Sequence, residues 1–140
     1  MRGAIAIAMC IATAAPSIAS AADVSGLWLT TSGSTQVEIR KCGAVGYCGT
    51  IRSTTAAQGG PALDRNNKNP NLRGRPLVGI VMLDGFKGGP AKWTGGTLYN
   101  PADGNTYKSS LTLQDPDHLA VEGCVAAFLC RSQIWTRLKS

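Results

Sequence analysis

The stretch from Asp64 to Gly79 holds a dense group of charged and amide side chains. One carboxylate, Asp64, stands among four cations and four asparagines, and two prolines interrupt the stretch, so that a loop is predicted instead of a strand. Guanidinium groups bind carboxylates and phosphates through two parallel hydrogen bonds. These residue types therefore support ion pairing within the loop or recognition of an anionic ligand. The cations are Arg65, Lys68, Arg73 and Arg75, and the asparagines are Asn66, Asn67, Asn69 and Asn71.

Two interpretations of this loop are open. Asp64 could pair with Arg73 or Arg75 and fold the loop back on itself, with asparagines capping backbone groups in its turns. Alternatively, the loop is a lid or rim that presents arginines to an anionic ligand. Because Asp64 is the only acid between residues 53 and 83, it cannot neutralise four cations, and we predict that Arg73 or Arg75 remains available. The candidate ligand-binding residues of the loop are Asp64, Asn67, Asn69, Arg73 and Arg75.

The sequence carries no signature of catalysis, a metal site or a cofactor. His118 is the only histidine, and a calcium loop is disfavoured because Lys68 stands where a ligand oxygen is needed. The acids are scattered, and only Asp115 and Asp117 lie close together, in a turn. No nucleophile elbow, P-loop or dinucleotide-type glycine pattern occurs. We therefore predict that the protein is not an enzyme and has no catalytic residue, no metal and no cofactor.

Aromatic and apolar residues offer two further candidates. Trp93, Tyr99 and Tyr107 lie on one predicted hairpin, either as core residues or as the wall of a ligand site, and we keep them as candidate ligand-binding residues. Residues 125–129 form a wholly apolar segment at the predicted tip of the last hairpin. Such a tip either contacts a partner or membrane, or tucks over the end of the domain.

Short segments with alternating apolar and polar residues position these side chains. In residues 36–41, Val37 and Ile39 share one face and Glu38 and Arg40 the other, as in a half-buried strand. Turn signals separate the segments, and no convincing helical period follows residue 22. We predict an all-β domain, a small antiparallel up-and-down barrel of about eight strands with one long polar loop; a two-sheet sandwich is the alternative. The predicted strands are residues 26–30, 36–41, 47–52, 78–83, 91–99, 106–113, 118–124 and 130–138.

The first residues predict the compartment. Arg2, an apolar run over residues 4–15, Pro16 and a small-x-small end describe a secretory signal peptide over residues 1–21, and a buried N-terminal helix is the alternative. The run is too short to span a membrane, so the protein is predicted to be periplasmic or secreted and not transmembrane. A single domain then covers residues 22–140. The chain has 14 cations, one of them Arg2, and 8 anions, so the mature protein carries a net charge of +5, which favours an anionic envelope component over nucleic acid as partner.

Four cysteines remain after the leader, and an even number in an oxidising compartment predicts two disulfides. If Cys42 faces Cys48 across a hairpin, Ile39 opposes Ile51 and Glu38 opposes Arg52. In the same way, Cys124 facing Cys130 sets Leu119 against Trp135 and Asp117 against Arg137. Directly opposed strand positions have the separation that a disulfide needs. We therefore predict the local bridges Cys42–Cys48 and Cys124–Cys130.

The ends of the chain and a series of motifs resemble a known family. Gly26-x-Trp28 and Trp135-Thr136-Arg137 look like the lipocalin-type closure, in which an arginine of the last strand covers a tryptophan of the first. The whole series resembles the bacterial family catalogued as domain of unknown function 2147, small exported proteins with a lipocalin-like barrel. The resemblance implies that fold, a periplasmic address and no established activity. The motifs are Cys42-Gly-x-x-Gly-x-Cys48-Gly49, Asp64-x-x-Asn67-x-Asn69-Pro70, Leu72-Arg73-x-Arg75-Pro76-Leu77-x-Gly79, Lys92-Trp93-x-Gly95-Gly96-x-x-Tyr99-x-Pro101-x-x-Gly104-x-x-Tyr107 and Ser132-Gln133-x-Trp135-Thr136-Arg137.

Two functional hypotheses follow. The first is a non-enzymatic exported barrel that binds a small amphipathic or anionic ligand at its mouth, with Arg73 and Arg75 near the rim. The second is an envelope protein that contacts lipid, polysaccharide or a partner protein through a basic face or the apolar hairpin tip. The volume of the barrel interior separates them, because a filled barrel excludes the first.

Overall fold

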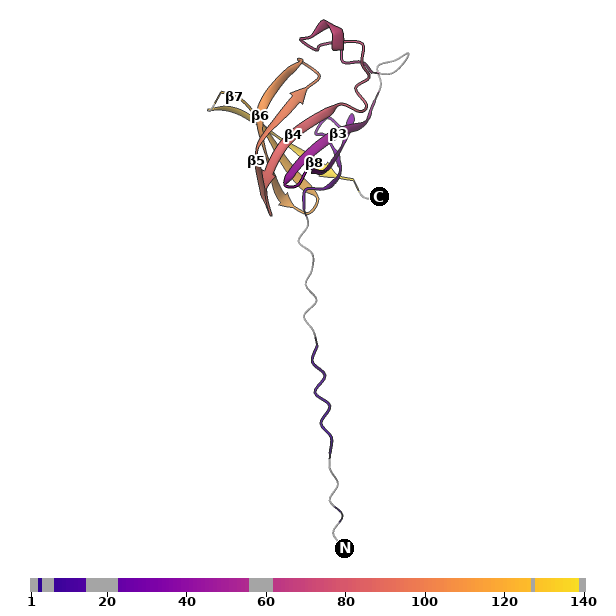
Figure 1. The fold of residues 1–140 in the computed structure, drawn as a ribbon, viewed down its shortest axis with the longest axis vertical. Helices are drawn as coiled ribbons and strands as arrows, with labels where there is room; N and C mark the ends of the chain where they lie inside the picture. The colour runs from indigo at the N-terminus through magenta and orange to yellow at the C-terminus, as the bar shows by residue number, and fades with distance from the viewer. Residues whose placement is uncertain (1–2, 4–6, 15–22, 56–61, 127, 139–140) are drawn as a thin grey trace.

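Eight antiparallel strands close into a barrel in which every strand pairs with its neighbours in chain order and β8 pairs with β1 (Figure 1). This computed structural model describes residues 3, 7–14, 23–55, 62–126 and 128–138. The predicted all-β up-and-down barrel with one long polar loop is confirmed, and the sandwich is excluded. The elements are β1 (Gly26–Leu29), β2 (Thr35–Cys42), β3 (Gly46–Thr54), the short 3₁₀ helix η1 (Pro70–Leu72), β4 (Val81–Gly88), β5 (Lys92–Asn100), β6 (Asn105–Asp115), β7 (His118–Ala126) and β8 (Leu129–Arg137).

The up-and-down order gives the barrel two different ends. One end carries the β2–β3, β4–β5 and β6–β7 turns together with the start of β1 and the end of β8. The other end, called the mouth below, carries the β1–β2 turn, the long β3–β4 connection, the β5–β6 turn and the β7–β8 hairpin tip. The polar loop and the apolar tip therefore belong to the same end of the molecule.

The core fills the closed half of the barrel. Trp28, Trp93, Trp135 and Phe86 are buried, and they pack with aliphatic residues of β2, β6 and β7. Gly96 makes room for this packing, because a Cβ there would lie 2.5 Å from the Phe86 ring. Large side chains thus fill this half of the barrel.

The fourth strand extends further than predicted. The sequence predicts a strand over residues 78–83 with a turn after it, whereas β4 begins later, at Val81, and continues to Gly88. Gly85 adopts a positive φ of 75° within the strand, and Phe86, directly after it, points into the core. The glycines therefore mark an irregular strand and not its end.

Both predicted disulfides join the expected cysteines, Cys42 to Cys48 and Cys124 to Cys130. In the last hairpin the predicted register is confirmed, since Cys124 opposes Cys130 and Leu119 opposes Trp135. In the first hairpin the predicted register is wrong by two residues.

The tighter turn of the first hairpin explains this difference. Cys42 opposes Gly46, which shortens the turn and sets Arg40 opposite Cys48, so that the bridge runs diagonally. Glu38 then opposes Thr50 and reaches Arg52 diagonally, with 2.8 Å between Oε2 and Nε. The predicted ion pair exists although the two residues are not directly opposed.

Arg137 closes the barrel as the resemblance implies. Its guanidinium carbon lies 4.3 Å from the centroid of the Trp28 ring. Its three nitrogens donate hydrogen bonds of 2.6 Å to the carbonyl oxygens of Asp23, Ser25 and Pro116. The last strand is thereby joined to the segment before β1 and to the β6–β7 turn.

Arg137→Lys is expected to lower the free energy of unfolding by about 1–2 kcal/mol, because an ammonium group cannot hold three carbonyls and stack on the indole at once. Chemical denaturation of the disulfide-intact protein measures the change. Arg52→Lys on the exposed β2–β3 ion pair is the control and should leave the denaturation midpoint almost unchanged. Equal effects of the two substitutions would contradict a special role for Arg137.

The predicted leader lies largely outside the described residues, and its boundary at residue 21 is among those not described. Residues 7–14 form no helix or strand. Among the described residues, no helix has the length and apolar character needed to cross a membrane.

Candidate functional site

Asp64 is the centre of the long polar loop and is fully buried. One carboxylate oxygen, Oδ1, accepts a 2.5 Å hydrogen bond from the Tyr99 hydroxyl. The other, Oδ2, accepts hydrogen bonds from Asn67 Nδ2 at 2.8 Å and from Arg75 Nε at 2.9 Å. These four residues, called the clasp below, tie the loop to β5.

Backbone contacts hold the two arms of the loop together around the clasp. The Asp64 N–H donates to the Arg75 carbonyl at 3.0 Å, and Leu63 pairs with Pro76 in an isolated antiparallel bridge. Arg73 Nε donates to the Asn67 carbonyl at 2.8 Å. The loop is therefore folded back on itself, as the first interpretation of its sequence predicts.

The polar loop that carries the clasp, called the clasp loop below, also packs on the β5–β6 turn. Asn66 Nδ2 donates to the carbonyls of Pro101 and Ala102 at 3.2 and 3.0 Å. Gly104, at a φ of +72°, lies against the Asn66 carbonyl so closely that an added Cβ would overlap it. A glycine is therefore needed there for its conformation and for its missing side chain.

Burial raises the pKa of Asp64, but the hydrogen bonds from Tyr99, Asn67 and Arg75 and the charge of Arg75 outweigh it and bring the pKa below the ordinary value of 3.8. Burial and the neighbouring carboxylate raise the pKa of Tyr99 above 10.0. The carboxylate is thus ionised and the phenol neutral near pH 7, which is the state that their hydrogen bond requires. Since donors occupy both oxygens of Asp64, the arrangement is an internal ion pair and not a vacant ligand site.

The structure places the predicted loop residues in different roles. Asp64, Asn67, Arg75 and Tyr99 come together in the clasp, while Asn69 accepts a hydrogen bond from the Asn71 N–H and caps η1. The Nε groups of Arg73 and Arg75 are occupied, and the Arg75 side chain is 38% exposed. Whether either arginine also meets a ligand stays a prediction.

A second set of residues forms a cavity of about 360 Å³ at the mouth. It lies between β5, β6 and the β7–β8 hairpin. One part of its lining is apolar, and the other carries a cation, a carboxylate, two amides and a phenol. The lining residues are Leu98, Asn100, Asp103, Tyr107, Val121, Gly123, Val125, Leu129, Arg131 and Gln133. An adjoining hollow of about 450 Å³ under the β1–β2 turn shares Asn100 and Gln133 with it.

The two charged side chains of this cavity, Asp103 and Arg131, differ in their partners. Asp103 accepts hydrogen bonds from the Tyr107 hydroxyl and the Asn105 N–H. Burial raises the pKa of Asp103, but these hydrogen bonds and the charge of Lys68 hold it below 3.8. Within the described part of the chain, no carboxylate lies within 4.0 Å of the Arg131 guanidinium. Arg131 is therefore the cation of the cavity that has no ion-pair partner there.

Of the three predicted aromatics, Tyr107 alone lines this cavity. Trp93 is buried in the core, in edge contact with Tyr47 at 6.0 Å between ring centroids. Tyr99 points to the outer face of the barrel, where it belongs to the clasp. Together with the predicted residues Asn67, Asn69 and Arg75 it also lines an open groove of about 550 Å³ on that face. A bulge in β5 between Trp93 and Gly96 reverses the alternation of inward and outward side chains along the strand. Trp93 and Tyr99 therefore lie on opposite faces of the sheet.

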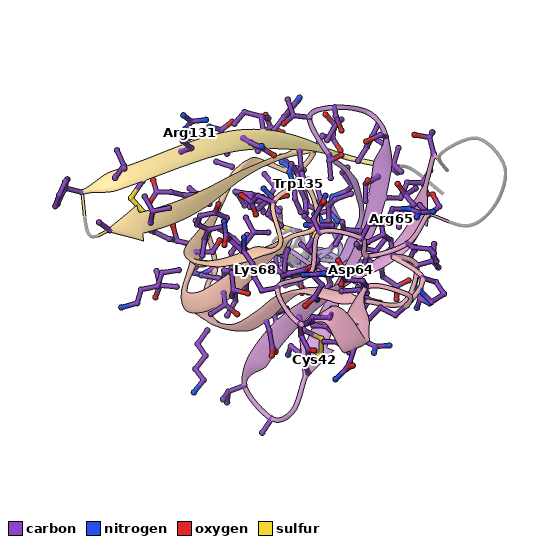
Figure 2. All side chains as sticks on the ribbon, turned by 90° about the horizontal axis from the view of Figure 1, so that it is seen from above. Cys42, Asp64, Arg65, Lys68, Arg131 and Trp135 are labelled. Carbon is purple, nitrogen blue, oxygen red and sulfur yellow. A yellow bond between two sulfur atoms is a disulfide. The ribbon has the colours of Figure 1, made fainter. Side chains whose placement is uncertain are left out.

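Four residues of the cavity were not predicted from the sequence: Asn100, Asp103, Arg131 and Gln133. Strand parity could have found two of them, because Gln133 and Arg131 stand two and four residues before the buried Trp135 and therefore share its inward face. Figure 2 shows that Arg131 lies on the β7–β8 hairpin, apart from Asp64 and Lys68 in the clasp loop.

One group of described residues has metal-ligand spacing, namely Glu122, Cys124 and Cys130. Two of its three members form the Cys124–Cys130 disulfide, so their sulfurs are not thiolate ligands in the oxidised protein. The group therefore does not make a candidate metal site.

Comparison with known proteins supports the fold. A solved structure of a Helicobacter pylori protein described as belonging to the lipocalin family aligns with a TM-score of 0.75 and 23% sequence identity over 84% of each chain. No curated protein matches the sequence significantly. The family model described as "Uncharacterized protein conserved in bacteria (DUF2147)" matches residues 26–137, from the start of β1 to the end of β8. The chain therefore belongs to the bacterial family catalogued as domain of unknown function 2147, and its barrel is lipocalin-like.

Proposed function

We propose that this protein is an exported, non-enzymatic binding barrel whose mouth holds one small amphipathic anion. The observation that carries the proposal is the cavity of about 360 Å³ between an apolar wall and Arg131. Ligand sites typically have volumes of about 300–1,000 Å³, so this cavity suits a small ligand. The predicted leader and the two disulfides support export.

The order of residues along the last hairpin gives the ligand a direction. Leu119 opposes Trp135 in the filled core, Val121 opposes Gln133 above them, and Gly123 opposes Arg131 nearer the mouth. An apolar chain would therefore lie inward against Leu98 and Val121. Its anionic group would remain near the entrance, where Arg131 donates charge-assisted hydrogen bonds.

The carboxylate of Asp103 is compatible with an anionic ligand. Its hydrogen bonds come from Tyr107 and Asn105, and Lys68 is the cation that acts on it. The amides of Asn100 and Gln133 offer neutral donors beside Arg131. In this cavity the Asp103 carboxylate already accepts hydrogen bonds from the protein, whereas the Arg131 guanidinium has no ion-pair partner among the described residues.

Isothermal titration calorimetry with decanoate tests the proposal. We expect saturable binding with one site, and Arg131→Gln should weaken it by about tenfold or more, since a hydrogen bond to a charged group contributes about 1.5–3 kcal/mol. The effect should be larger at low salt. Decanol, which lacks the charge, should bind the native protein and Arg131→Gln alike.

Arg40→Gln is the matched control, because Arg40 is an exposed strand arginine near the closed end. It should leave decanoate binding unchanged. If decanoate does not bind saturably, or if both substitutions weaken it equally, the proposed function is wrong.

Contact with the cell envelope is the second candidate function. The observation that favours it is the exposure of Val125, Phe128 and Leu129 at the tip of the last hairpin. This surface does not depend on whether the cavity binds a ligand.

A further inference from the structure

We propose that the tip of the β7–β8 hairpin docks the barrel mouth on an anionic phospholipid bilayer. Three neighbouring apolar side chains stand in solvent there: Val125 is 62% exposed, Phe128 89% and Leu129 60%. The sequence from Val125 to Leu129 contains no polar side chain. Exposed apolar clusters of this kind mark contact surfaces, and an aromatic residue at the outermost position is typical of insertion at the headgroup boundary.

The tip projects from the body of the molecule. In Figures 1 and 2 the β7–β8 hairpin extends sideways beyond the other strands, so a flat surface could reach it. The Cys124–Cys130 disulfide joins the two strands directly behind the tip. The bridge holds the apolar residues as one unit, which reduces the entropy lost on docking.

Cations lie immediately behind the apolar residues. Arg131 follows Cys130, and Lys108 opposes Cys124 on the neighbouring strand; both are exposed. Among the described residues, two carboxylates lie near these cations. Glu122 lies further from the tip on β7 and is partly buried, and Asp103, in the cavity lining, accepts hydrogen bonds from Tyr107 and Asn105. An apolar edge followed by cations matches the depth order of a bilayer, with acyl chains below phosphate groups, and gives charge complementarity to anionic lipid.

A second copy of the chain fits this surface less well. Three side chains offer far less area than the roughly 800 Å² per partner that a stable interface buries. Two tips in contact would also bring Arg131 and Lys108 of both copies together, and like charges oppose such a contact. A bilayer has neither restriction, because it surrounds the tip and supplies phosphates to the cations.

Docking would also place the cavity at the lipid surface, and this part rests on the proposed function. Val125, Leu129 and Arg131 belong both to the tip region and to the cavity lining. The apolar surface is therefore continuous from the tip into the mouth, so an amphipathic anion could pass between bilayer and cavity without crossing water.

Sedimentation with extruded vesicles of phosphatidylglycerol and phosphatidylethanolamine tests the docking surface. Every variant is prepared from the same full chain. If the predicted leader over residues 1–21 is retained, it therefore contributes equally to the binding of all variants. We expect Phe128→Ser to lower the partition coefficient by about tenfold, from the lost burial of one aromatic side chain. Lys108→Gln should lower it about fivefold on these vesicles but leave binding to phosphatidylcholine vesicles unchanged.

The chain offers a matched control at the opposite end of the barrel. Val45 is 68% exposed in the β2–β3 turn, beside the Cys42–Cys48 disulfide, much as Val125 stands beside Cys124–Cys130. Val125→Ser should weaken vesicle binding by several-fold and Val45→Ser should not. Equal effects of these two substitutions, no binding to anionic vesicles, or a concentration-dependent dimer that Phe128→Ser abolishes would overturn the proposal. Decanoate binding by Phe128→Ser is measured alongside, and its retention separates a failed docking surface from a failed binding cavity.

Discussion

Asp64→Asn is expected to lower the free energy of unfolding by about 2–3 kcal/mol and Tm by roughly 10 °C. The native carboxylate is fully buried and receives hydrogen bonds from Tyr99, Asn67 and Arg75. An amide in its place loses the negative charge that pairs with Arg75. Its NH₂ group would also face one of the hydrogen-bond donors that now bind the carboxylate. Because Arg75 is 38% exposed, water can reach its guanidinium, and the cost stays below that of breaking a fully buried pair.

Asp84→Asn is the matched control for this measurement. Asp84 is exposed on β4 and makes no side-chain hydrogen bond to the described residues. Its substitution should change the free energy of unfolding by less than about 0.5 kcal/mol. A loss of that small size for Asp64→Asn as well would contradict the assignment of the clasp as the structural centre of the loop.

The difference between the native protein and Asp64→Asn should also depend on pH. The pKa of Asp64 is lower in the folded chain than its ordinary value of 3.8, so the folded state binds fewer protons and the carboxylate stabilises it above that pH. The contribution is fully present at neutral pH and is lost as the pH falls through the folded-state value. Denaturation measured from pH 7 downward should therefore show the two proteins converging below about pH 4.

Gly104→Ala is expected to lower the free energy of unfolding by about 3 kcal/mol. About 1 kcal/mol comes from the φ of +72°, which an L side chain rarely adopts, and the remainder from overlap of the new Cβ with the Asn66 carbonyl. The overlap should displace the clasp loop from the β5–β6 turn. Chemical denaturation measures the loss, and limited proteolysis within residues 62–80 measures the displacement.

Gly33→Ala isolates the two contributions, because Gly33 has the same φ of +72° and open space where the Cβ would stand. It should cost about 1 kcal/mol and leave the proteolysis of the clasp loop unchanged. The double substitution Asp64→Asn with Gly104→Ala should cost less than the two single effects together, since both release the same loop. Full additivity, or equal effects of Gly33→Ala and Gly104→Ala, would show that the loop is not docked through Asn66.

The sequence was sufficient for the fold and for the pairing of cysteines because both depend on local patterns. Alternation of residues such as Val37 and Ile39 predicts strands, and their short turns leave the up-and-down order as the simplest topology. The register of the first hairpin could not be predicted, because the same cysteines can be joined directly or diagonally. Only the turn at Cys42 and Gly46 distinguishes the two.

The candidate site was likewise predictable only in part. The shortage of acids in the loop predicts that Asp64 pairs with Arg73 or Arg75, but it does not show that the partner is Arg75. The part played by Tyr99 depends on a β5 bulge that no simple pattern predicts. Arg131 and Gln133 share the parity of Trp135 and were predictable in principle. The depth at which the core ends and the cavity begins depends on the packing of Trp93, Phe86 and Trp135, and hence on the full three-dimensional structure.

Intermolecular NOEs between decanoate and methyl-labelled protein test most directly whether the mouth cavity is the binding site. Leu98 and Val121 line the cavity, whereas Val81, Thr97 and Thr106 line the open groove on the outer face beside the clasp. We predict NOEs from the alkyl protons of bound decanoate to the methyl groups of Leu98 and Val121, and none to those of Val81 and Thr97. NOEs confined to Val81 and Thr97, or no NOE to Leu98 and Val121 at saturating decanoate, would contradict binding in the mouth cavity.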